Sequence, residues 1–430
     1  MNWLISGGRI LDPVSGRDEK MDLLLKGGSI FKAGKGLPAG RGVKKVDASG
    51  HLVIPGLIDM HCHLREPGFE YKETVATGCA AAVKGGITSV MCMANTEPVN
   101  DCASVTAYIL EKAALAGLAR VYPIGAVTRG MEGESLSEMA ELAQSGCVAV
   151  SDDGNPVKSS ATMRRALEYA ALFDLLVIDH AEDRSISGEG VMHEGFVSTM
   201  LGLEGIPSTA SLNDVGRDIS LVREFGSRIH IAHVSTRSEV DLIRRAKAEG
   251  LAVTAETCPH FFTLDHEAVI GFNTSAKVNP PLRTADDVEA IIEGLADGTI
   301  EVIATDHAPH HRDEKDREFD LAAFGISGFE TALALTLRLV QKKRLKLMDA
   351  VAKWTVNPAR IAGLPGGSLT EGSPADLVLV DLDAQWTVDP DHFLSMGRNT
   401  PFAGMELTGE VVNTFVGGKM VYDREKGIIS

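Results

Sequence analysis

The sequence has little of what would mark a secreted, disulfide-bonded or membrane protein. Its 430 residues include only six cysteines, and no C-x-x-C pair occurs, which argues against a disulfide framework and against a thiolate zinc site. No segment reaches the roughly 18 consecutive apolar residues of a membrane span, and the first residues lack a basic region followed by an apolar run. We therefore expect a soluble, cytoplasmic protein.

Basic residues are also scarce. The chain has 42 Lys and Arg against 59 Asp and Glu, a net charge of −17, which argues against nucleic acid or an anionic membrane as a partner. The hydrophobic fraction of 44% is that of a globular protein with a sizeable core. The length exceeds that of one ordinary domain, but α/β barrels reach about 250 residues as one unit. The sequence thus contains one large domain with an accessory piece, or two ordinary domains.

Short apolar segments alternate with Ala- and Leu-rich helical stretches from residue 53 onward. The expected strands are Val53–Cys62, Ile87–Met93, Val121–Val127, Val148–Ser151, Leu175–Ile178, Ile229–Ala232, Leu251–Glu256 and Val302–Thr305. The expected helices are Thr74–Lys84, Ala103–Ala116, Ser135–Ser145, Ala161–Phe173, Ser235–Glu249, Ala285–Leu295 and Gly328–Gln341. Eight such units predict an α/β fold, a closed (β/α)8 barrel of the TIM type.

The two ends of the chain lack this alternation and instead contain short strands separated by Gly and Asp turns. We expect residues 1–54 and 365–430 to form together a small β-sandwich-like domain. Residues 55–364 are then the catalytic barrel.

Histidines and aspartates follow several of the expected strands, at the barrel end where active sites lie. His61 and His63 are two residues apart on one strand and therefore point to the same side; alone, the pair is equally compatible with core histidines. His180, His233 and Asp306 follow three other strands. These donors suit zinc or a similar divalent ion, and the set exceeds the needs of one tetrahedral ion. It favours a two-metal centre.

Asp153, after the fourth strand, is the expected bridge between two ions, with Asp152 as its competitor. Alternation lets only one of the two enter the barrel mouth. Asp306 is either a ligand alone or also the acid/base that moves a proton from water to a leaving nitrogen. Asp59 and His307 are expected to be structural. Other histidines are expected at surface or packing positions: His51, His193, His230, His266 and His392.

Longer motifs cover nearly the whole chain, and the set is highly specific. They are His63–Gly68, Met93–Thr96, Ser151–Gly154, His233–Thr236, Glu256–His260, Lys277–Arg283, Ala304–His310 and Asn357–Arg360. On these residues the sequence resembles the amidohydrolase superfamily and, within it, the class I bacterial dihydroorotases. One departure is that residues 148–151 contain no lysine, whereas many relatives use a carboxylated lysine there as the metal bridge. Lys158 comes only after a turn.

The resemblance implies a hydrolase of pyrimidine biosynthesis that interconverts N-carbamoyl-L-aspartate and (S)-dihydroorotate, with one or two Zn²⁺ ions, two being favoured. It implies a homodimer and leaves association with aspartate transcarbamoylase open. It assigns the catalytic role to Asp306 and the metal sites to His61, His63, Asp153, His180, His233 and Asp306. It assigns substrate binding to His63, Arg65, Asn95, Asn279, His310, Phe324 and Gly325.

Two alternatives follow from the same residues. One is another cyclic amidase, a hydantoinase or allantoinase, although a neutral ring needs no Arg65 clamp. The other is a non-catalytic partner of aspartate transcarbamoylase, which would be expected to lose metal ligands. The charged segment 311–323 is either a mobile lid or a solvated loop.

Overall fold

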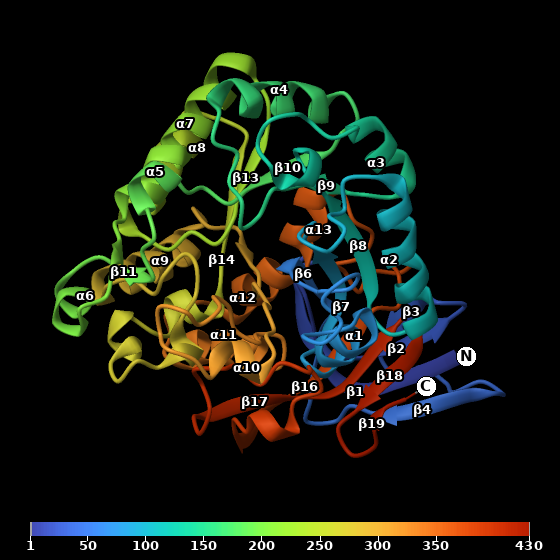
Figure 1. The fold of residues 1–430 in the computed structure, drawn as a ribbon. Coiled ribbons are helices and arrows are strands. Elements are labelled where there is room, and N and C mark those ends of the chain that lie inside the picture. Colours follow the sequence, from blue (N-terminus) through green and yellow to red (C-terminus); the bar gives the residue numbers. More distant parts are fainter. Residues whose placement is uncertain (1, 430) are drawn as a thin grey trace.

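Eight parallel strands form the central sheet of the molecule. The computed structural model describes residues 2–429. The sheet runs in the order β15-β14-β13-β10-β9-β8-β7-β6, which follows the chain from β6 onward (Figure 1). The strands are β6 (Leu57–Cys62), β7 (Ile87–Cys92), β8 (Arg120–Gly125), β9 (Ala149–Val150), β10 (Leu176–Asp179), β13 (Ile229–Ile231), β14 (Val253–Thr257) and β15 (Val302–Ile303).

The first strand, β6, and the last strand, β15, are joined by hydrogen bonds between the segments at their C-terminal ends. The Asp306 amide donates to the His61 carbonyl at 3.0 Å, and the His63 amide donates to the His307 carbonyl at 2.8 Å. Cys62 and His307 form a parallel bridge. The sheet therefore closes on itself, and the predicted barrel is confirmed.

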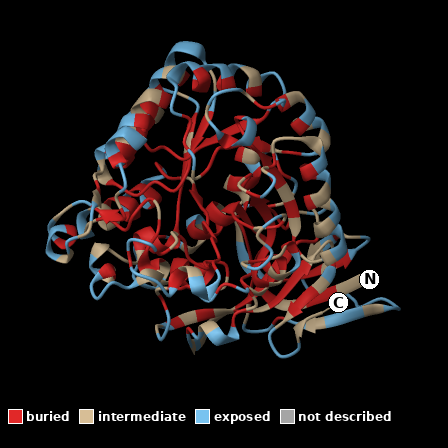
Figure 2. Cartoon of the chain, viewed as in Figure 1, coloured by how far each residue is buried: buried red, intermediate tan, exposed pale blue. Residues whose placement is uncertain are grey.

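Helices surround the barrel (Figure 1), and their outer sides are the exposed ones (Figure 2). The main ones are α1 (Val75–Lys84), α2 (Ala103–Ala116), α3 (Met139–Ser145), α4 (Ser160–Ala171), α7 (Thr209–Phe225), α8 (Arg237–Ala248), α9 (Ala285–Asp297), α11 (Ala332–Gln341), α12 (Leu347–Trp354) and α13 (Val356–Ala362). Capping boxes begin α8, from Thr236 to Glu239, and α9, from Thr284 to Asp287. Local sequence thus fixes where these helices begin.

Short elements interrupt the loops at the open end of the barrel. They are α5 (Arg184–Ser187), α6 (Phe196–Leu201), α10 (Arg312–Lys315) and the two-stranded sheet of β11 (Met192–His193) and β12 (Gly205–Ile206). None of the helices in residues 2–429 is long and apolar enough to cross a membrane.

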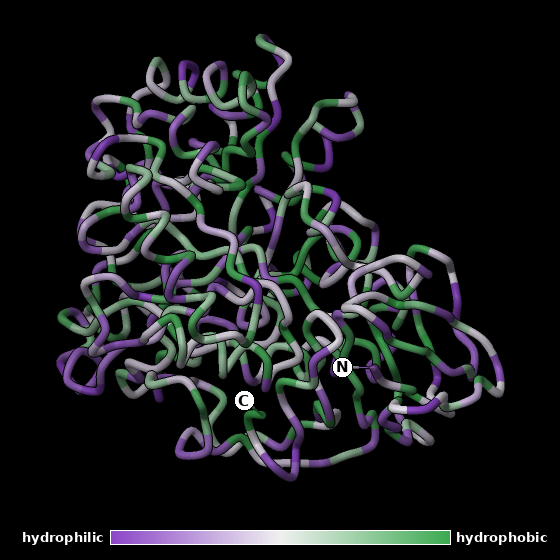
Figure 3. Tube along the Cα trace, turned by 90° about the vertical axis from the view of Figure 1, so that its right-hand side faces the viewer, coloured by the Kyte–Doolittle hydropathy of each residue, from purple (hydrophilic) through white to green (hydrophobic). Residues whose placement is uncertain are grey.

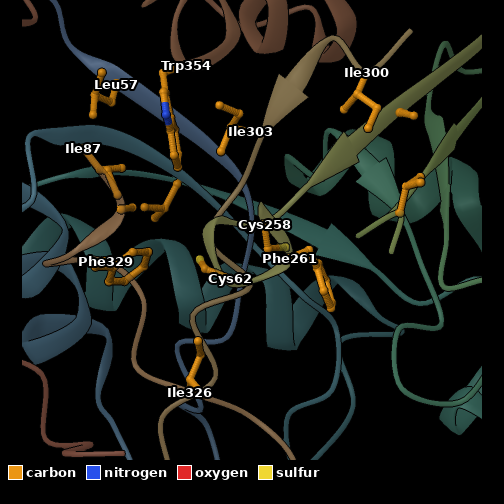
Figure 4. Packing of buried hydrophobic residues seen from close by; sticks show 14 of the residues in the cluster. Leu57, Cys62, Ile87, Cys258, Phe261, Ile300, Ile303, Ile326, Phe329 and Trp354 are labelled. Carbon is orange, nitrogen blue, oxygen red and sulfur yellow. The ribbon is translucent and has the colours of Figure 1, made fainter. Parts of the chain in front are cut away.

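The barrel encloses its own hydrophobic core. Alternate residues of the strands, such as Ile58, Met60 and Ile178, pack with Ile361 of α13. A second and larger cluster lies between the strands and the helices, where Figure 4 shows Trp354, Leu57 and Ile303. The hydropathy trace agrees, because hydrophobic segments lie inside and hydrophilic ones in the outer loops (Figure 3).

Both chain ends contribute to a separate nine-stranded sheet, as expected for an accessory β domain. Its strands are β1 (Asn2–Asp12), β2 (Arg17–Lys26), β3 (Ser29–Gly34), β4 (Val43–Asp47), β5 (Leu52–Pro55), β16 (Leu377–Thr387), β17 (Glu406–Val416), β18 (Lys419–Asp423) and β19 (Gly427–Ile428). β5 joins the two halves, because it pairs with β1 on one side and β16 on the other. Its hydrophobic cluster includes Ile5, Leu23 and Phe415.

The expected single strand Val53–Cys62 is in fact two. β5 belongs to the accessory sheet and β6 to the barrel, and the chain changes sheet at Gly56. A Cβ at Gly56 would overlap the Thr88 side chain, so only glycine lets the backbone pass this close.

Several helices also differ from expectation. α11 begins at Ala332 instead of Gly328, and α12 and α13 were not expected. The helix expected from Ser135 begins at Met139, because Leu136 bridges Thr128 and the Ser137 hydroxyl donates to main-chain carbonyls. α7, with 17 residues, was not expected. Its Asp214, Arg217 and Asp218 form an ion-pair group on the buried side, and this polar pattern obscures the helical period.

Removal of the Trp354 side chain tests whether the helix-to-barrel layer carries the stability. Trp354 is 1% exposed, and its indole donates to the Thr336 hydroxyl at 3.1 Å. We expect Trp354→Ala to lower the free energy of unfolding by about 3–5 kcal/mol in urea titrations, because it leaves a large cavity and removes the hydrogen bond to the Thr336 hydroxyl. Phe196→Ala, at a side chain 80% exposed, is the control and should change it by less than about 0.5 kcal/mol. Equal losses in both variants would contradict this assignment of the core.

Candidate metal centre and substrate pocket

A β-bulge in β6 turns two histidines toward the barrel axis. Ile58 and Met60 face the barrel core, so simple alternation would direct Cys62 inward as well. The register shifts between Asp59 and Cys62, and Cys62 instead packs in the outer cluster. His61 and His63 thereby face the inside at the end of the strand, in the paired orientation that the sequence predicted.

The carboxylate of Asp153 lies at the centre of the histidine cluster. Its Oδ1 is 3.3 Å from His180 Nδ1, 3.4 Å from His233 Nε2 and 3.4 Å from His61 Nε2. Its Oδ2 is 3.5 Å from His63 Nε2. Burial alone would raise the pKa of Asp153, but the surrounding imidazoles lower it well below the ordinary value. The two oxygens thus face different histidines.

Asp152 points elsewhere. Its carboxylate accepts hydrogen bonds from the backbone amides of Val127 and Thr128 at 2.7 and 3.1 Å, and from the Thr128 hydroxyl. Burial raises its pKa to about 6. The sequence left two candidates for the bridging aspartate. In the structure Asp153 lies in the histidine cluster, whereas Asp152 binds the loop at Val127 and Thr128.

Asp306 completes the cluster from the end of β15. Its Oδ1 lies 3.1 Å from His63 Nε2 and 3.6 Å from His61 Nε2. Burial would raise its pKa, but His63 and His61 lower it to about 2. His233 and Asp306 both have positive φ angles, 34° and 47°. Such strained backbone is typical of functional sites in which the fold holds a side chain in place.

A layer of acids and amides orients the histidine rings. Glu256 Oε1 is 2.7 Å from His61 Nδ1, and Asn95 Oδ1 is 2.9 Å from His63 Nδ1. Glu182 Oε2 is 3.0 Å from His180 Nε2. Each contact engages one ring nitrogen and leaves the other directed at the cluster, the usual arrangement around metal-binding histidines.

Sequence reasoning gave no role to Glu256 or Glu182. Burial would raise the pKa of Glu256, but His61 and His230 lower it to about 2. His230, expected at a packing position, is buried and lies 3.3 Å from Glu256. The available signals were that Glu256 ends an expected strand and that Glu182 follows His180 by two residues.

The donor atoms fit a divalent metal ion. Ligand atoms of His61, His63 and Asp306 all lie within 4.8 Å of one another, as do those of His61, Asp153 and His233. His61 Nε2 and Asp153 Oδ1 are buried without a hydrogen-bond partner among the described residues. Buried polar atoms normally have partners, and nitrogen and oxygen donors in this arrangement match zinc. The cluster is therefore a candidate metal centre.

Cys258 and His260 lie beside Asp306 as a third group of this kind. Burial raises the pKa of the Cys258 thiol well above its ordinary value, which disfavours the thiolate that a metal would need. His260 is buried, and neither ring nitrogen has a hydrogen-bond partner in the described part of the chain. His260 ends the motif Glu256–His260, and the sequence indicated no role for it.

A cavity of about 240 Å³ opens over the cluster. Its lining contains the predicted substrate-binding residues together with three of the cluster and three further residues: His63, Arg65, Asn95, Asp153, Gly154, His180, Arg184, Asn279, Asp306, Ala308, His310, Phe324 and Gly325. His61 and His233 contact Asp153 from behind this lining. Lys158 is exposed and is not part of it.

Arg65 is fixed on one side of the cavity. Its Nε donates to the Pro309 carbonyl at 3.1 Å, and its Nη2 lies 3.2 Å from His310 Nε2. Burial lowers its pKa, while Asp306 and Glu314 act in the opposite direction. The guanidinium is thus held by the segment that follows β15.

The cavity lining also includes Asn279 and Arg184. Asn279 Nδ2 donates to Glu182 Oε2 at 3.0 Å. Arg184, on the short helix α5, donates to the Gly154 carbonyl at 3.0 Å. Sequence reasoning missed Arg184, because it lies in a loop with no strand end or motif to mark it.

Asp59 and His307 point away from the cavity, as expected. Asp59 accepts a hydrogen bond from the Thr305 amide at 2.9 Å. The His307 ring stacks on Phe329 with centroids 3.8 Å apart and accepts a hydrogen bond from the Gly328 amide. Both therefore fix the backbone at the junction of β15 and β6.

Solved structures with the same fold include a hydantoinase and a dihydropyrimidinase. L-Hydantoinase (dihydropyrimidinase) from Arthrobacter aurescens superposes with a TM-score of 0.89 at 24% identity, over 100% of this chain and 97% of that one. Dihydropyrimidinase from Brevibacillus agri gives a TM-score of 0.87 at 23% identity, over 100% and 96%. At this identity the likeness concerns the fold.

Sequence relatives are much more similar. The chain is 55% identical over 422 residues to a dihydroorotase of Syntrophotalea carbinolica, covering 98% of this chain and 99% of that protein. It is 55% identical over 424 residues to a dihydroorotase of Geobacter metallireducens, covering 99% and 100%. A model of the amidohydrolase family matches residues 52–421. The chain therefore belongs to the amidohydrolase family and, within it, to the group of proteins named dihydroorotase.

Proposed function

We propose that the protein is a zinc-dependent dihydroorotase, which interconverts (S)-dihydroorotate and N-carbamoyl-L-aspartate. The observation that carries the proposal is a single cavity with a histidine and aspartate cluster on its floor and the Arg65 guanidinium on its wall. The full-length similarity to proteins named dihydroorotase supports it.

The proposed substrate is an anion whose ring contains the C–N bond to be hydrolysed, and the cavity offers partners for its carboxylate and for its ring. Arg65 presents a planar fork of donors that suits a carboxylate, with Asn95 and His310 beside it. Asn279 and the backbone of Phe324 and Gly325, on other parts of the lining, would hold the ring. His63 would contact the substrate at the edge of the cluster.

The cluster divides into two ligand sets that share one carboxylate. His61, His63 and Asp306 would hold one zinc ion, and His180 with His233 a second, with Asp153 between them. Zinc bound there would supply a water of lowered pKa and polarise the amide carbonyl. Asp153 lies within 3.5 Å of histidines of both sets, which supports its shared role.

Asp306 is the proposed acid/base. In the hydrolytic direction its carboxylate accepts a proton from the attacking water and then delivers it to the ring nitrogen as the C–N bond breaks. Neighbouring histidines lower the pKa of Asp306, so its carboxylate is ionised at neutral pH and free to accept a proton. Arg65 and Asn279 keep the scissile bond over this carboxylate.

The proposal extends to a cytoplasmic homodimer, which the motif resemblance supports. The resemblance leaves association with aspartate transcarbamoylase open. Neutral-ring hydrolysis is the competing activity. One metal-quantified sample should be assayed with dihydroorotate, allantoin and a hydantoin. Turnover confined to dihydroorotate supports the proposal. Turnover of the neutral rings alone, or of none of the three substrates, would refute it.

Loss of the Arg65 guanidinium tests the carboxylate clamp. We expect Arg65→Met to lower kcat/KM for dihydroorotate by roughly 100- to 1,000-fold, because a buried charged hydrogen-bond partner is removed. Zinc content should be unchanged, since Arg65 holds no metal. Arg164→Met, at an exposed arginine paired with Glu168, is the control and should retain activity. Normal kcat/KM in Arg65→Met would exclude the clamp.

The neighbouring aspartates provide a matched pair for the metal centre. We expect Asp153→Ala to lose bound zinc and activity, because the histidines lose their shared carboxylate. Asp152→Ala should keep its zinc but lower the free energy of unfolding by about 1–3 kcal/mol, since the Val127 and Thr128 amides lose their acceptor. Elemental analysis and urea titration measure the two effects. The reverse pattern would show that Asp152 is the metal ligand.

A further inference from the structure

Two buried lysines lie beneath the segment that carries Phe324 and Gly325. Lys277 is 2% exposed and Lys315 is 6% exposed. Neither lines the cavity, and neither has a role in the proposed chemistry. Burial of an ammonium group costs free energy unless hydrogen bonds or charges compensate for it.

The ammonium of Lys315 binds three main-chain carbonyls. It donates to Ala323 O at 2.7 Å, to Gly325 O at 3.1 Å and to Lys277 O at 3.4 Å. A lysine ammonium has three donors, so all of them are directed at this backbone. Two of the acceptors flank Phe324.

Lys277 holds the same segment from a second point. Its ammonium donates to Phe319 O at 2.7 Å and to Asp320 O at 3.0 Å. It also lies 4.5 Å from the centre of the Phe324 ring, within range of a cation–π interaction. The Lys277 carbonyl accepts from the Gly325 amide at 2.9 Å. The backbone is thus held on both sides of Phe324.

The held backbone reaches the cavity directly. The Phe324 carbonyl lies 2.8 Å from His310 Nε2, and the Gly325 carbonyl accepts from Asn399 Nδ2 at 3.0 Å. Gly325 has a φ of 129°, and a Cβ there would lie 2.7 Å from the Ala308 side chain. Small shifts of this backbone therefore change the shape of the ring-binding side.

Burial imposes a strong cost on the charged forms of both lysines. Burial and the nearby Lys277 ammonium together lower the pKa of Lys315 to about 7. Burial likewise lowers the pKa of Lys277 to about 8. An apolar side chain would fill the same space without this cost, but it could not bind carbonyls.

We infer that Lys315, together with Lys277, is a positioning residue that latches the Phe324–Gly325 backbone against the cavity so that this backbone can bind the substrate ring. The inference rests on the proposed function. It also bears on segment 311–323, which the sequence left as lid or solvated loop. Phe319 and Ala322 are buried, so the end of this segment is a packed wall, held from below by the two ammonium groups.

Lys315→Met tests the latch, because methionine keeps the volume and donates no hydrogen bond. We expect KM for dihydroorotate to rise about tenfold or more while kcat changes by less than about threefold, the pattern of a lost binding contact. Zinc content should equal that of the wild-type protein. The matched control is Lys353→Met, at another buried lysine, which donates to Ile300 O from α12 and lies away from the cavity. Its KM should stay at the wild-type value.

A second measurement, the rate of trypsin cleavage, tests how firmly segment 311–323 is held and does not depend on activity. Arg317 is exposed, so trypsin cleavage after it should be faster in Lys315→Met than in the wild type or Lys353→Met. If Lys315→Met does not fold, Lys277→Met is compared in the same two assays and should show the same changes.

The outcomes separate this inference from the proposed function. Zinc-loaded wild-type protein that does not turn over dihydroorotate refutes the function, and cleavage rates still decide whether Lys315 holds the segment. The inference about Lys315 is overturned if the wild-type protein is active and the folded Lys315→Met variant has the wild-type KM and the wild-type rate of trypsin cleavage. An equal rise of KM in Lys353→Met would also overturn it, because the effect would then be one of general stability.

Discussion

The buried carboxylate of Asp153 is the constraint on which the site depends. It lies within 3.5 Å of four imidazoles, and an ion buried in this way is tolerated only when other charges and hydrogen bonds compensate it. The compensation extends outward, because Glu256, Asn95 and Glu182 each engage the far nitrogen of a histidine ring. The closed barrel makes this possible, since it brings the ends of separate strands to one point.

The same arrangement explains how an acidic protein can bind an anionic substrate. The chain has a net charge of −17, whereas the proposed substrate is itself an anion, so the protein as a whole does not attract it. Locally, the Arg65 guanidinium and divalent ions bound among the histidines would reverse the sign. The nearby acids do not undo this, because Glu256 and Glu182 are each paired with a histidine. Recognition is thus a property of the cavity wall.

Much of the fold and of the site could be predicted, because strands and their polar ends are local features of sequence. His61 and Asp306 were found in this way. The choice of Asp153 over Asp152 was only inferred, since it depends on which carboxylate the Thr128 loop binds. Glu182 was missed because its role arises from a loop folded back on a histidine. The break at Gly56 was missed because β5 and β6 form one continuous apolar run, and only the packing of Thr88 separates them.

The features that escaped prediction share a physical origin, which is backbone held in place by distant groups. Arg65, His233 and Asp306 adopt positive φ angles of 63°, 34° and 47°, a conformation that costs free energy for side chains of this kind. No local pattern predicts them, because the closed barrel supplies the compensating contacts, including the bond between the Asp306 amide and His61. The Phe324–Gly325 backbone depends in the same way on ammonium groups beneath it. The residues that carry the proposed chemistry lie near strand ends, which the sequence reveals. The orientation of their side chains depends on the whole fold.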